Sequence, residues 1–359
     1  NIRLFGNGGE MLPENNAIPR ADDLTENALS MYDGGDGVFN PGDYFLFYAN
    51  GPHSIVKDSA NKRFTHIYNV YSDLSYYFLT FDQGAGKRIQ TAALPGNATV
   101  NVSSFNEYAF YEKDSVNPGK FGKNWWGDEF NDQPGRYLTR NYSFSFPNTV
   151  QSTMASIRVR VGAISYSGTS TMNVYANNNV LQSVNLTQIG QSYSDPVLRV
   201  SDLRSELMPS GDNLNLRFTF SKGNSGAFGY LDFFEINLRR DLVFNGYLNF
   251  ADWNSVGSGQ IAQYTLQQAN ATTEVWDITN PLVPERMSTT LSGSQLSFRC
   301  DASSLHRFVA TNGSVVNTPV FVEKVSNQNL HSVSGKDYLI ITHPAFKAEA
   351  ERLAAWHSA

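Results

Sequence analysis

The chain has 359 residues and a formal net charge of −6 at pH 7, with 17% charged and 13% aromatic residues. This length predicts two or three domains, and few charges with many aromatic residues and Asn/Gly turns are typical of an exported, mostly β protein, not of a helical bundle. The lack of a basic run argues against nucleic acid as a partner, and no apolar stretch has the roughly 18–20 residues of a transmembrane segment.

The first block, residues 1–100, is predicted to be a β-rich domain. Apolar, aromatic runs between turn residues indicate its strands. They are predicted in GDYFLFYANG (42–51), RFTHIYNVY (63–71) and SYYFLTF (75–81). Residues 24–32 could form a short helix or a strand, because their periodicity does not distinguish the two. The sequence opens directly on a predicted strand, Ile2–Phe5, so we expect a removed leader or a longer parent protein.

The second block, residues 105–240, carries the clearest pattern. Ile157 and Val159 alternate with Arg158 and Arg160, and such alternation indicates antiparallel sheets with one buried face. Strands are predicted in EYAFYEKD (107–114), NWWGDEF (124–130), NYSFSFP (141–147), ASIRVRVGAIS (155–165), TMNVYAN (171–177), VLQSVNL (180–186), NLNLRFTFSK (213–222) and AFGYLDFFEINLRR (227–240). This succession of strands and turns predicts a jelly-roll-like β-sandwich.

The third block, residues 241–330, is predicted to be a small β domain. Its short strands are expected in LVFNGYLNF (242–250), AQYTLQQA (262–269), TTEVWDIT (272–279), QLSFRCD (295–301) and HRFVAT (306–311). No repeat period connects them. The fold class predicted for the body of the chain is therefore multi-domain antiparallel β.

The pattern changes in residues 331–359. DYLIITHP (337–344) is a nearly continuous apolar run, as expected of a parallel strand that is covered on both faces. After Pro344, which favours a first helical turn, an apolar stripe over residues 346–354 predicts a helix. One strand and one helix cannot bury their own surface. We therefore expect this β-α unit to begin a truncated α/β domain.

Cys300 is the only cysteine, so an intrachain disulfide is excluded. It alternates with Leu296 and Phe298 along a predicted strand, which favours a place in the core, where free cysteines are common. A nucleophile would need a lowered pKa and a nearby base. His306 is near in sequence, but no recognisable motif surrounds the pair. We therefore favour packing over catalysis.

The histidines show no spacing that indicates a zinc site. His66 falls within a predicted strand, where a structural role is favoured. His343 would lie at the carboxyl end of the predicted parallel strand, where open α/β sheets bind ligands. We favour the simpler interpretation that His343 begins the helix, because the rest of such a site is absent from the sequence.

The Gly-rich stretch YDGGDGVFNPGD (32–43) is the one candidate metal site. Its carboxylates, Asp33, Asp36 and Asp43, lie among glycines, and calcium is held by oxygen ligands on tight turns. The EF-hand spacing is not met, and no Glu closes the loop. A plain turn before the strand that follows is therefore the favoured interpretation, with weak calcium binding as the alternative.

Trp125 and Trp126 stand next to each other and could provide a platform for sugar rings. Adjacent residues of a strand point to opposite faces, so at most one of them can belong to any one platform. Burial of a Trp between domains is the alternative.

The segment NQNLHSVSGKDYLIITHPAFKAEAERLAAWH (327–357) resembles the opening of the peptidase domain in the sortases of the Bacteroidetes type IX secretion system, a family of gingipain-type cysteine peptidases. Weaker similarities to the region before that domain follow in the order of the family. They are GDGVFNPGDYFLFYANGPH (35–53), YSDLSYYFLT (71–80), NWWGDEF (124–130), YLDFFEINLRR (230–240) and VWDITNP (275–281). The resemblance therefore extends over essentially the whole chain.

The resemblance implies that this chain is the β-rich, non-catalytic region ahead of a cysteine peptidase domain. In the family the catalytic Cys and His lie downstream and match neither Cys300 nor His343, so no catalytic residue and no cofactor is expected here. The family removes C-terminal sorting domains from exported cargo and helps attach the cargo to surface lipopolysaccharide. Outer-membrane secretion partners, exported cargo and a location in the cell envelope are implied. A freestanding surface adhesin or carbohydrate-binding β-sandwich protein is the alternative.

Overall fold

The computed structural model describes residues 1–81, 83–120, 122 and 124–357. The chain forms two compact units, Asn1–Val315 and Val316–Ala359. The predicted boundaries near residues 100 and 240 lie inside the first unit, and the finer division that they describe stays a prediction. None of the helices in the described residues has the length and apolar character needed to span a bilayer.

The predicted β-sandwich is present, and we call it the first sandwich. One sheet has the order β10 (Ser104–Glu112), β18 (Phe228–Asp241), β13 (Ala155–Ile164) and β16 (Arg199–Leu207), with β11 (Glu129–Phe130) also on β18. The other has the order β12 (Thr139–Ser145), β17 (Asn213–Ser221), β14 (Ser170–Ala176) and β15 (Asn179–Leu186). All pairings are antiparallel. Ile157, Val159 and Val161 are buried as their alternation predicts.

Strand β16 was not predicted by its pattern. Its sequence, RVSDLRSEL, is mostly exposed or half-buried and lacks the apolar alternation of the other strands. It lies at the edge of its sheet and pairs with β13 alone, from Ala155↔Leu207 to Ala163↔Arg199. An edge strand with charged side chains is a common way to protect a sheet from unwanted pairing. Strand β16 therefore forms through its pairing with β13, although its own sequence favours a strand only weakly.

The third block forms a second sandwich with two sheets around one core. One sheet has the order β19 (Tyr247–Phe250), β25 (Phe308–Thr311), β21 (Glu274–Asp277), β22 (Glu285–Arg286) and β8 (Gln90–Thr91). The other has the order β23 (Thr289–Ser292), β24 (Gln295–Asp301), β20 (Ile261–Leu266) and β9 (Val100–Val102). Strand β8 comes from the first block and β9 begins at its last residue; they pair in parallel with β22 and β20, respectively. The second sandwich is therefore completed by residues far away in sequence.

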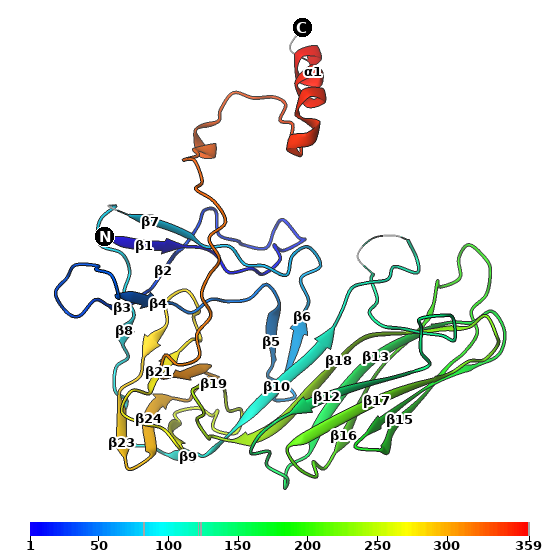
Figure 1. The fold of residues 1–359 in the computed structure, drawn as a ribbon, viewed down its shortest axis with the longest axis horizontal. Coiled ribbons are helices and arrows are strands. Elements are labelled where there is room, and N and C mark those ends of the chain that lie inside the picture. The colour runs from blue at the N-terminus through cyan, green and yellow to red at the C-terminus, as the bar shows by residue number, and fades with distance from the viewer. Residues whose placement is uncertain (82, 121, 123, 358–359) are drawn as a thin grey trace. The chain divides into compact units, whose positions relative to one another are not determined.

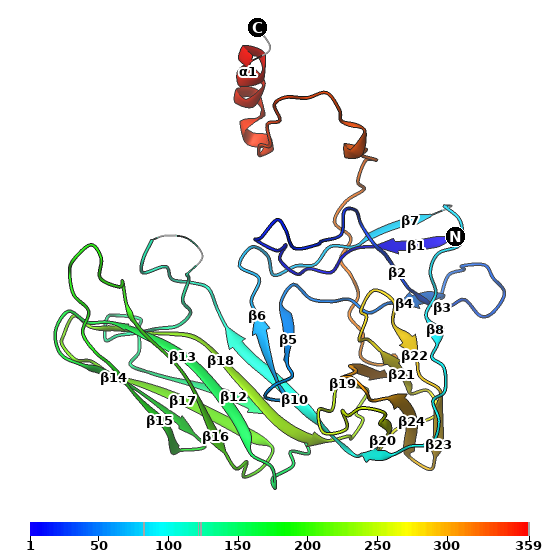
Figure 2. The ribbon, with the colours of Figure 1, turned by 180° about the vertical axis from the view of Figure 1, so that it is seen from behind.

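The remainder of the first block consists of small sheets. They are β2 (Glu26–Asn27), β1 (Ile2–Phe5) and β7 (Phe78–Phe81) in one sheet, β3 (Ser30–Tyr32) with β4 (Tyr44–Leu46), and β5 (Ser54–Asp58) with β6 (Arg63–Ile67). Residues 24–32 thus contain strands and no helix. Both views show the β5–β6 hairpin beside β10, between the two sandwiches (Figures 1 and 2).

The unit Val316–Ala359 contains the short turns η1 (Leu330–Ser332) and η2 (Pro344–Phe346) and the helix α1 (Lys347–His357). The predicted helix is confirmed, with Pro344 in η2, the helical turn directly before α1. The strand expected over residues 337–344 is absent. A strand needs a hydrogen-bonding neighbour, and no described residue of this unit belongs to any strand.

Candidate functional site

A buried histidine connects the β5–β6 hairpin to the first sandwich. The His66 side chain is 2% exposed, with its Nδ1 2.8 Å from Glu235 Oε1 and its Nε2 bonded to Glu112. Its ring stacks on Phe110, with 4.1 Å between ring centroids. A histidine between two carboxylates in a dry environment is more strongly held than a surface ion pair.

Side chains of strand β18 are hydrogen-bond partners for the backbone of β6 in the hairpin, where a neighbouring strand would otherwise supply backbone groups. Phe64 N donates to Asn237 Oδ1 at 2.8 Å, and Asn237 Nδ2 donates back to Phe64 O at 3.0 Å. Two residues away on each strand, His66 N donates to Glu235 Oε1 at 3.0 Å. Buried backbone groups require partners. Glu235 and Asn237 therefore fix the position of β6 on the outer face of the sheet.

The Glu235 carboxylate is fully buried and is surrounded by positive charge. Arg158 Nη1 and Arg204 Nη2 lie 3.3 and 3.7 Å from its Oε2. Burial alone would raise the pKa of Glu235, but its bonds to His66 and the positive charges outweigh burial and lower the pKa. Burial alone would lower the pKa of His66, and the two glutamates reverse this, so its pKa is raised. Both shifts therefore favour the charged forms, imidazolium on His66 and carboxylate on Glu235.

Next to His66, three carboxylates lie close together: Glu112 at the end of β10, Asp114 just after it, and Asp232 within β18. Oxygens of Glu112, Asp114 and Asp232 all lie within 4.8 Å of one another. Burial, followed by the charge of Glu112, raises the pKa of Asp114 to about 6, and burial also raises that of Asp232 to about 6 despite Arg160. Such a group could hold a proton or a divalent cation. Arg160 pairs with Asp232 and His66 with Glu112, so part of the charge is already balanced.

The predicted calcium residues do not gather in this way. Asp33, Asp36 and Asp43 lie on an exposed loop between β3 and β4, and among the described residues they form no group of three close carboxylates. Their oxygens accept from the loop's own backbone: Gly35 N to Asp33 at 3.1 Å and Val38 N to Asp36 at 2.8 Å. This is the hydrogen bonding of an Asx turn. Calcium binding at this loop stays a prediction.

Sequence reasoning missed the carboxylate group beside His66. Glu112 and Asp114 stand two residues apart, a spacing that puts side chains on one face of a strand. Asp232 lies more than a hundred residues further along the chain, and only the pairing of β10 with β18 brings it near. Local pattern contained a weak signal for the first two residues and none for the third.

Cys300 lies in the core of the second sandwich, as predicted. Burial raises the pKa of its thiol to about 12. Within the described residues it has no hydrogen bond to His306, whose Nδ1 instead bonds Asp277. A thiolate nucleophile needs the opposite environment. His343, in turn, is exposed, and its Nδ1 accepts from Ala345 N at 3.2 Å, as a residue that begins a helical turn does.

The two tryptophans have different environments. Trp126 is 2% exposed and packs under the Arg160 guanidinium, 5.2 Å from its ring centroid. Trp125 is 41% exposed. Of the two, Trp125 is therefore the one that a ligand can reach, although neither lies in a strand: the strand predicted at residues 124–130 is limited to β11.

Comparison with known proteins gives one extensive similarity. Neither models of protein families nor curated protein sequences match the chain. The crystal structure of dimeric latent PorU from Porphyromonas gingivalis matches 99% of the chain with a TM-score of 0.81 and 22% sequence identity. The chain has the fold of the N-terminal region of PorU. The match covers 33% of the PorU chain, so this chain spans about a third of the length of PorU.

Smaller matches involve carbohydrate-binding modules. A family 36 module in complex with calcium and xylotriose covers 36% of this chain and 98% of its own, with 19% identity and a TM-score of 0.24. A family 35 module from Clostridium thermocellum covers 38% of this chain and 98% of its own, with 11% identity and a TM-score of 0.22. Unlike PorU, these structures match only a part of the chain and at a low score.

Proposed function

We propose that this chain is the non-catalytic, β-rich N-terminal portion of a type IX secretion system sortase of the cysteine peptidase class. The observation that carries the proposal is the PorU fold, which extends over 99% of the chain. The region contributes architecture and docking, and the sortase removes C-terminal sorting domains from exported cargo and helps attach that cargo to the cell surface. Its partners are outer-membrane secretion proteins and cargo, in the cell envelope.

The chemistry of the chain supports a non-catalytic role. Its single thiol, Cys300, has a pKa raised to about 12 by burial, and the nearby His306 is bonded to Asp277. Peptide cleavage by this thiol would need a thiolate next to a free base. A carbohydrate-binding protein stays the alternative, for which Trp125, the exposed one of the two neighbouring tryptophans, offers a ring.

Gene deletion and complementation test the proposal. Without the gene that encodes this chain, exported cargo should retain its C-terminal sorting domain, which mass spectrometry of secreted proteins detects. The natural gene and a Cys300→Ser variant should both restore cleavage, since Cys300 is assigned to the core. Cargo that is processed normally without the gene would refute the proposal. A Cys300→Ser protein that is folded but inactive would refute the non-catalytic assignment.

A further inference from the structure

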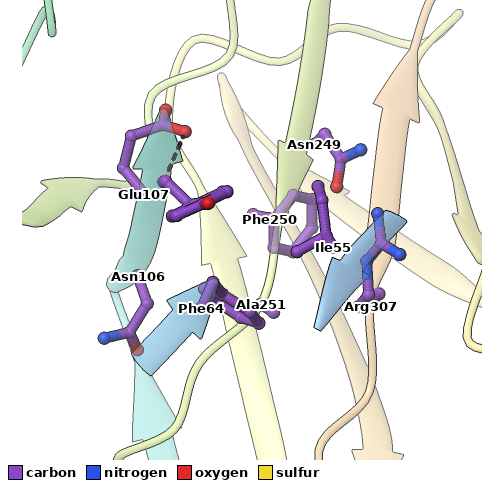
Figure 3. A pocket seen from close by; sticks show the side chains of 9 residues that line it. Ile55, Phe64, Asn106, Glu107, Asn249, Phe250, Ala251 and Arg307 are labelled. Carbon is purple, nitrogen blue, oxygen red and sulfur yellow. Dashed lines mark hydrogen bonds between the residues drawn. The ribbon is translucent and has the colours of Figure 1, made fainter. Parts of the chain in front are cut away.

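A small pocket lies where the β5–β6 hairpin meets both sandwiches (Figure 3). Its volume is about 140 Å³, close to the ~150 Å³ of a protein cavity that holds benzene. It is lined by Ile55, Phe64, Asn106, Glu107, Tyr108, Asn249, Phe250, Ala251 and Arg307. Pockets at junctions between domains, with an apolar lining and a few polar groups, are common ligand sites.

One part of the pocket is apolar and well packed. Phe64, Phe250 and Ala251 are buried, and Phe64 packs with Trp253 in the same cluster as Ala251. Ile55, which is 38% exposed, lines the pocket from strand β5. The space next to these side chains suits one small apolar group, because burying such a group removes apolar surface from water.

The other part carries an unpaired positive charge. Figure 3 shows Arg307 beside Asn249, on the side of the pocket opposite Glu107. The backbone of Arg307 is fixed, because its N donates to Thr279 Oγ1 at 3.0 Å and its O accepts from Ile278 N at 2.8 Å. Its guanidinium has no hydrogen bond or ion pair within the part of the chain that the structure describes. A half-buried guanidinium with five donors is a ready partner for an anion.

The surrounding charges also favour an anion. Burial, and then repulsion by Arg307, lowers the pKa of Lys57, whose Nζ donates to Leu305 O at 3.3 Å. Lys57 does not line the pocket, but its positive charge lies near that of Arg307, and the Asp277 carboxylate opposes part of this repulsion. The one carboxylate that lines the pocket, Glu107, is already paired with Arg240. Of the two charged residues that line the pocket, Arg307 is therefore the one whose charge is not balanced by an ion pair in the described residues.

We propose that this pocket binds a carboxylate carried on a small apolar group. Arg307 takes the carboxylate, because a planar guanidinium and a carboxylate match in two parallel hydrogen bonds. The space beside Phe64, Phe250 and Ile55 takes the apolar group. The C-terminal residue of a peptide has this chemistry, and so does a small free carboxylic acid. The site goes beyond the proposed function and does not depend on it.

Binding of N-acetyl-L-leucine to the full chain, followed by NMR titration, tests the proposal. The matched neutral probe is N-acetyl-L-leucinamide, which keeps the apolar group and lacks the charge. We expect the acid to bind at least about tenfold more tightly than the amide. The tripeptide acetyl-Gly-Gly-Leu, with a free or an amidated C-terminus, separates the two sources. If the tripeptide with a free C-terminus binds as tightly as N-acetyl-L-leucine or more tightly, the natural ligand is the C-terminus of a peptide chain. If the tripeptide does not bind, the ligand is a small carboxylic acid.

Three variants locate the site. Arg307→Gln should weaken binding of the acid about tenfold and remove its preference over the amide. Arg20→Gln removes the same charge from an exposed position and should leave binding unchanged. Ile55→Trp should fill the pocket and abolish binding of both probes. Thermal melts of each variant control for folding.

Several results would overturn the proposal. Equal binding of acid and amide would remove the role of the carboxylate. Binding that survives both Arg307→Gln and Ile55→Trp would place the site elsewhere. Competition by inorganic phosphate with no effect of Ile55→Trp would show an anion site without apolar selectivity. The absence of binding by any of the probes would refute the site itself.

Discussion

The first sandwich and the segment of residues 316–357 contain similar apolar side chains, which are buried in the sandwich and exposed in the segment. In the sandwich, Phe218 and Phe234 are completely buried in a core that both sheets supply. In the segment, Phe346 and Trp356 are 65% and 75% exposed. The difference shows that apolar patterning specifies a face but not its partner. Two sheets of one chain cover each other, and a single helix of eleven residues has no such partner within its unit.

The largest expected effect comes from truncating one phenylalanine in each region. Phe234→Ala should destabilise the protein by about 3–5 kcal/mol, because the ring is fully buried and the cavity left behind cannot collapse completely. Phe346→Ala should change the unfolding free energy by less than ~0.5 kcal/mol, as at other exposed sites. Denaturant unfolding of both variants measures the contrast. Similar losses from the two variants would mean that the segment is as integral to the fold as the sandwich core.

The next effect uses a matched pair of histidines. His66→Gln should destabilise by about 2–3 kcal/mol near pH 5.5, because the buried oxygens of Glu112 and Glu235 lose a charged hydrogen-bond partner. His343→Gln, at an exposed position of the segment, should have little effect. Thermal melts test both. An unchanged melting temperature in His66→Gln would show that Arg158 and Arg204 alone hold Glu235.

The pH dependence of the His66 variant follows from its ionisation. The pKa of His66 is raised above its ordinary 6.5, so its contribution is complete below pH 6.5 and is lost as the pH rises through the folded-state value. The pKa of Glu235 is lowered below 4.5, so its contribution is lost as the pH falls through that lower value. The natural chain should therefore be more stable near pH 5.5 than at pH 8.5. In His66→Gln this difference should be smaller.

A smaller effect is expected from removing the end of the chain. Deleting residues 336–359 should leave the melting temperature of the remainder nearly unchanged, because those residues belong to the other compact unit. Removing exposed Leu339, Ile341 and Trp356 should also reduce self-association measured by light scattering, since exposed apolar patches favour association. Unfolding of the shortened chain would contradict the division into two units.

The smallest effect concerns calcium at the loop of residues 33–43. Because these carboxylates already accept backbone N–H groups, we expect at most weak binding. A ligand at a concentration equal to its Kd stabilises by only ~0.4 kcal/mol, a change of about 1 °C in melting temperature. Melts with calcium and with EDTA measure it. A shift of several degrees that Asp36→Asn abolishes would make this loop a true metal site.

Much of the secondary structure could be predicted because it depends on the pattern of neighbouring residues in the sequence. Alternation in residues 155–165 predicted strand β13 and the side that it presents to the core, and β17 lies within the strand predicted at residues 213–222. Alternation likewise placed Cys300 inward, and the apolar stripe after Pro344 predicted α1. Edge strand β16 and the absent strand at 337–344 were not predictable, because pairing with a neighbour, not composition, decided each.

The sequence by itself determined which residues are strand formers, which faces are apolar and that the chain resembles a secretion-system sortase. Only the tertiary structure decided that β8 and β9 complete the second sandwich, and that β10, β18 and the hairpin meet at His66. The same holds for the pocket, whose lining comes from residues 55 to 307. Periodicity is a property of a few neighbouring residues. Burial, pKa shifts and pockets depend on groups that lie far apart in the chain and come together only in the folded state.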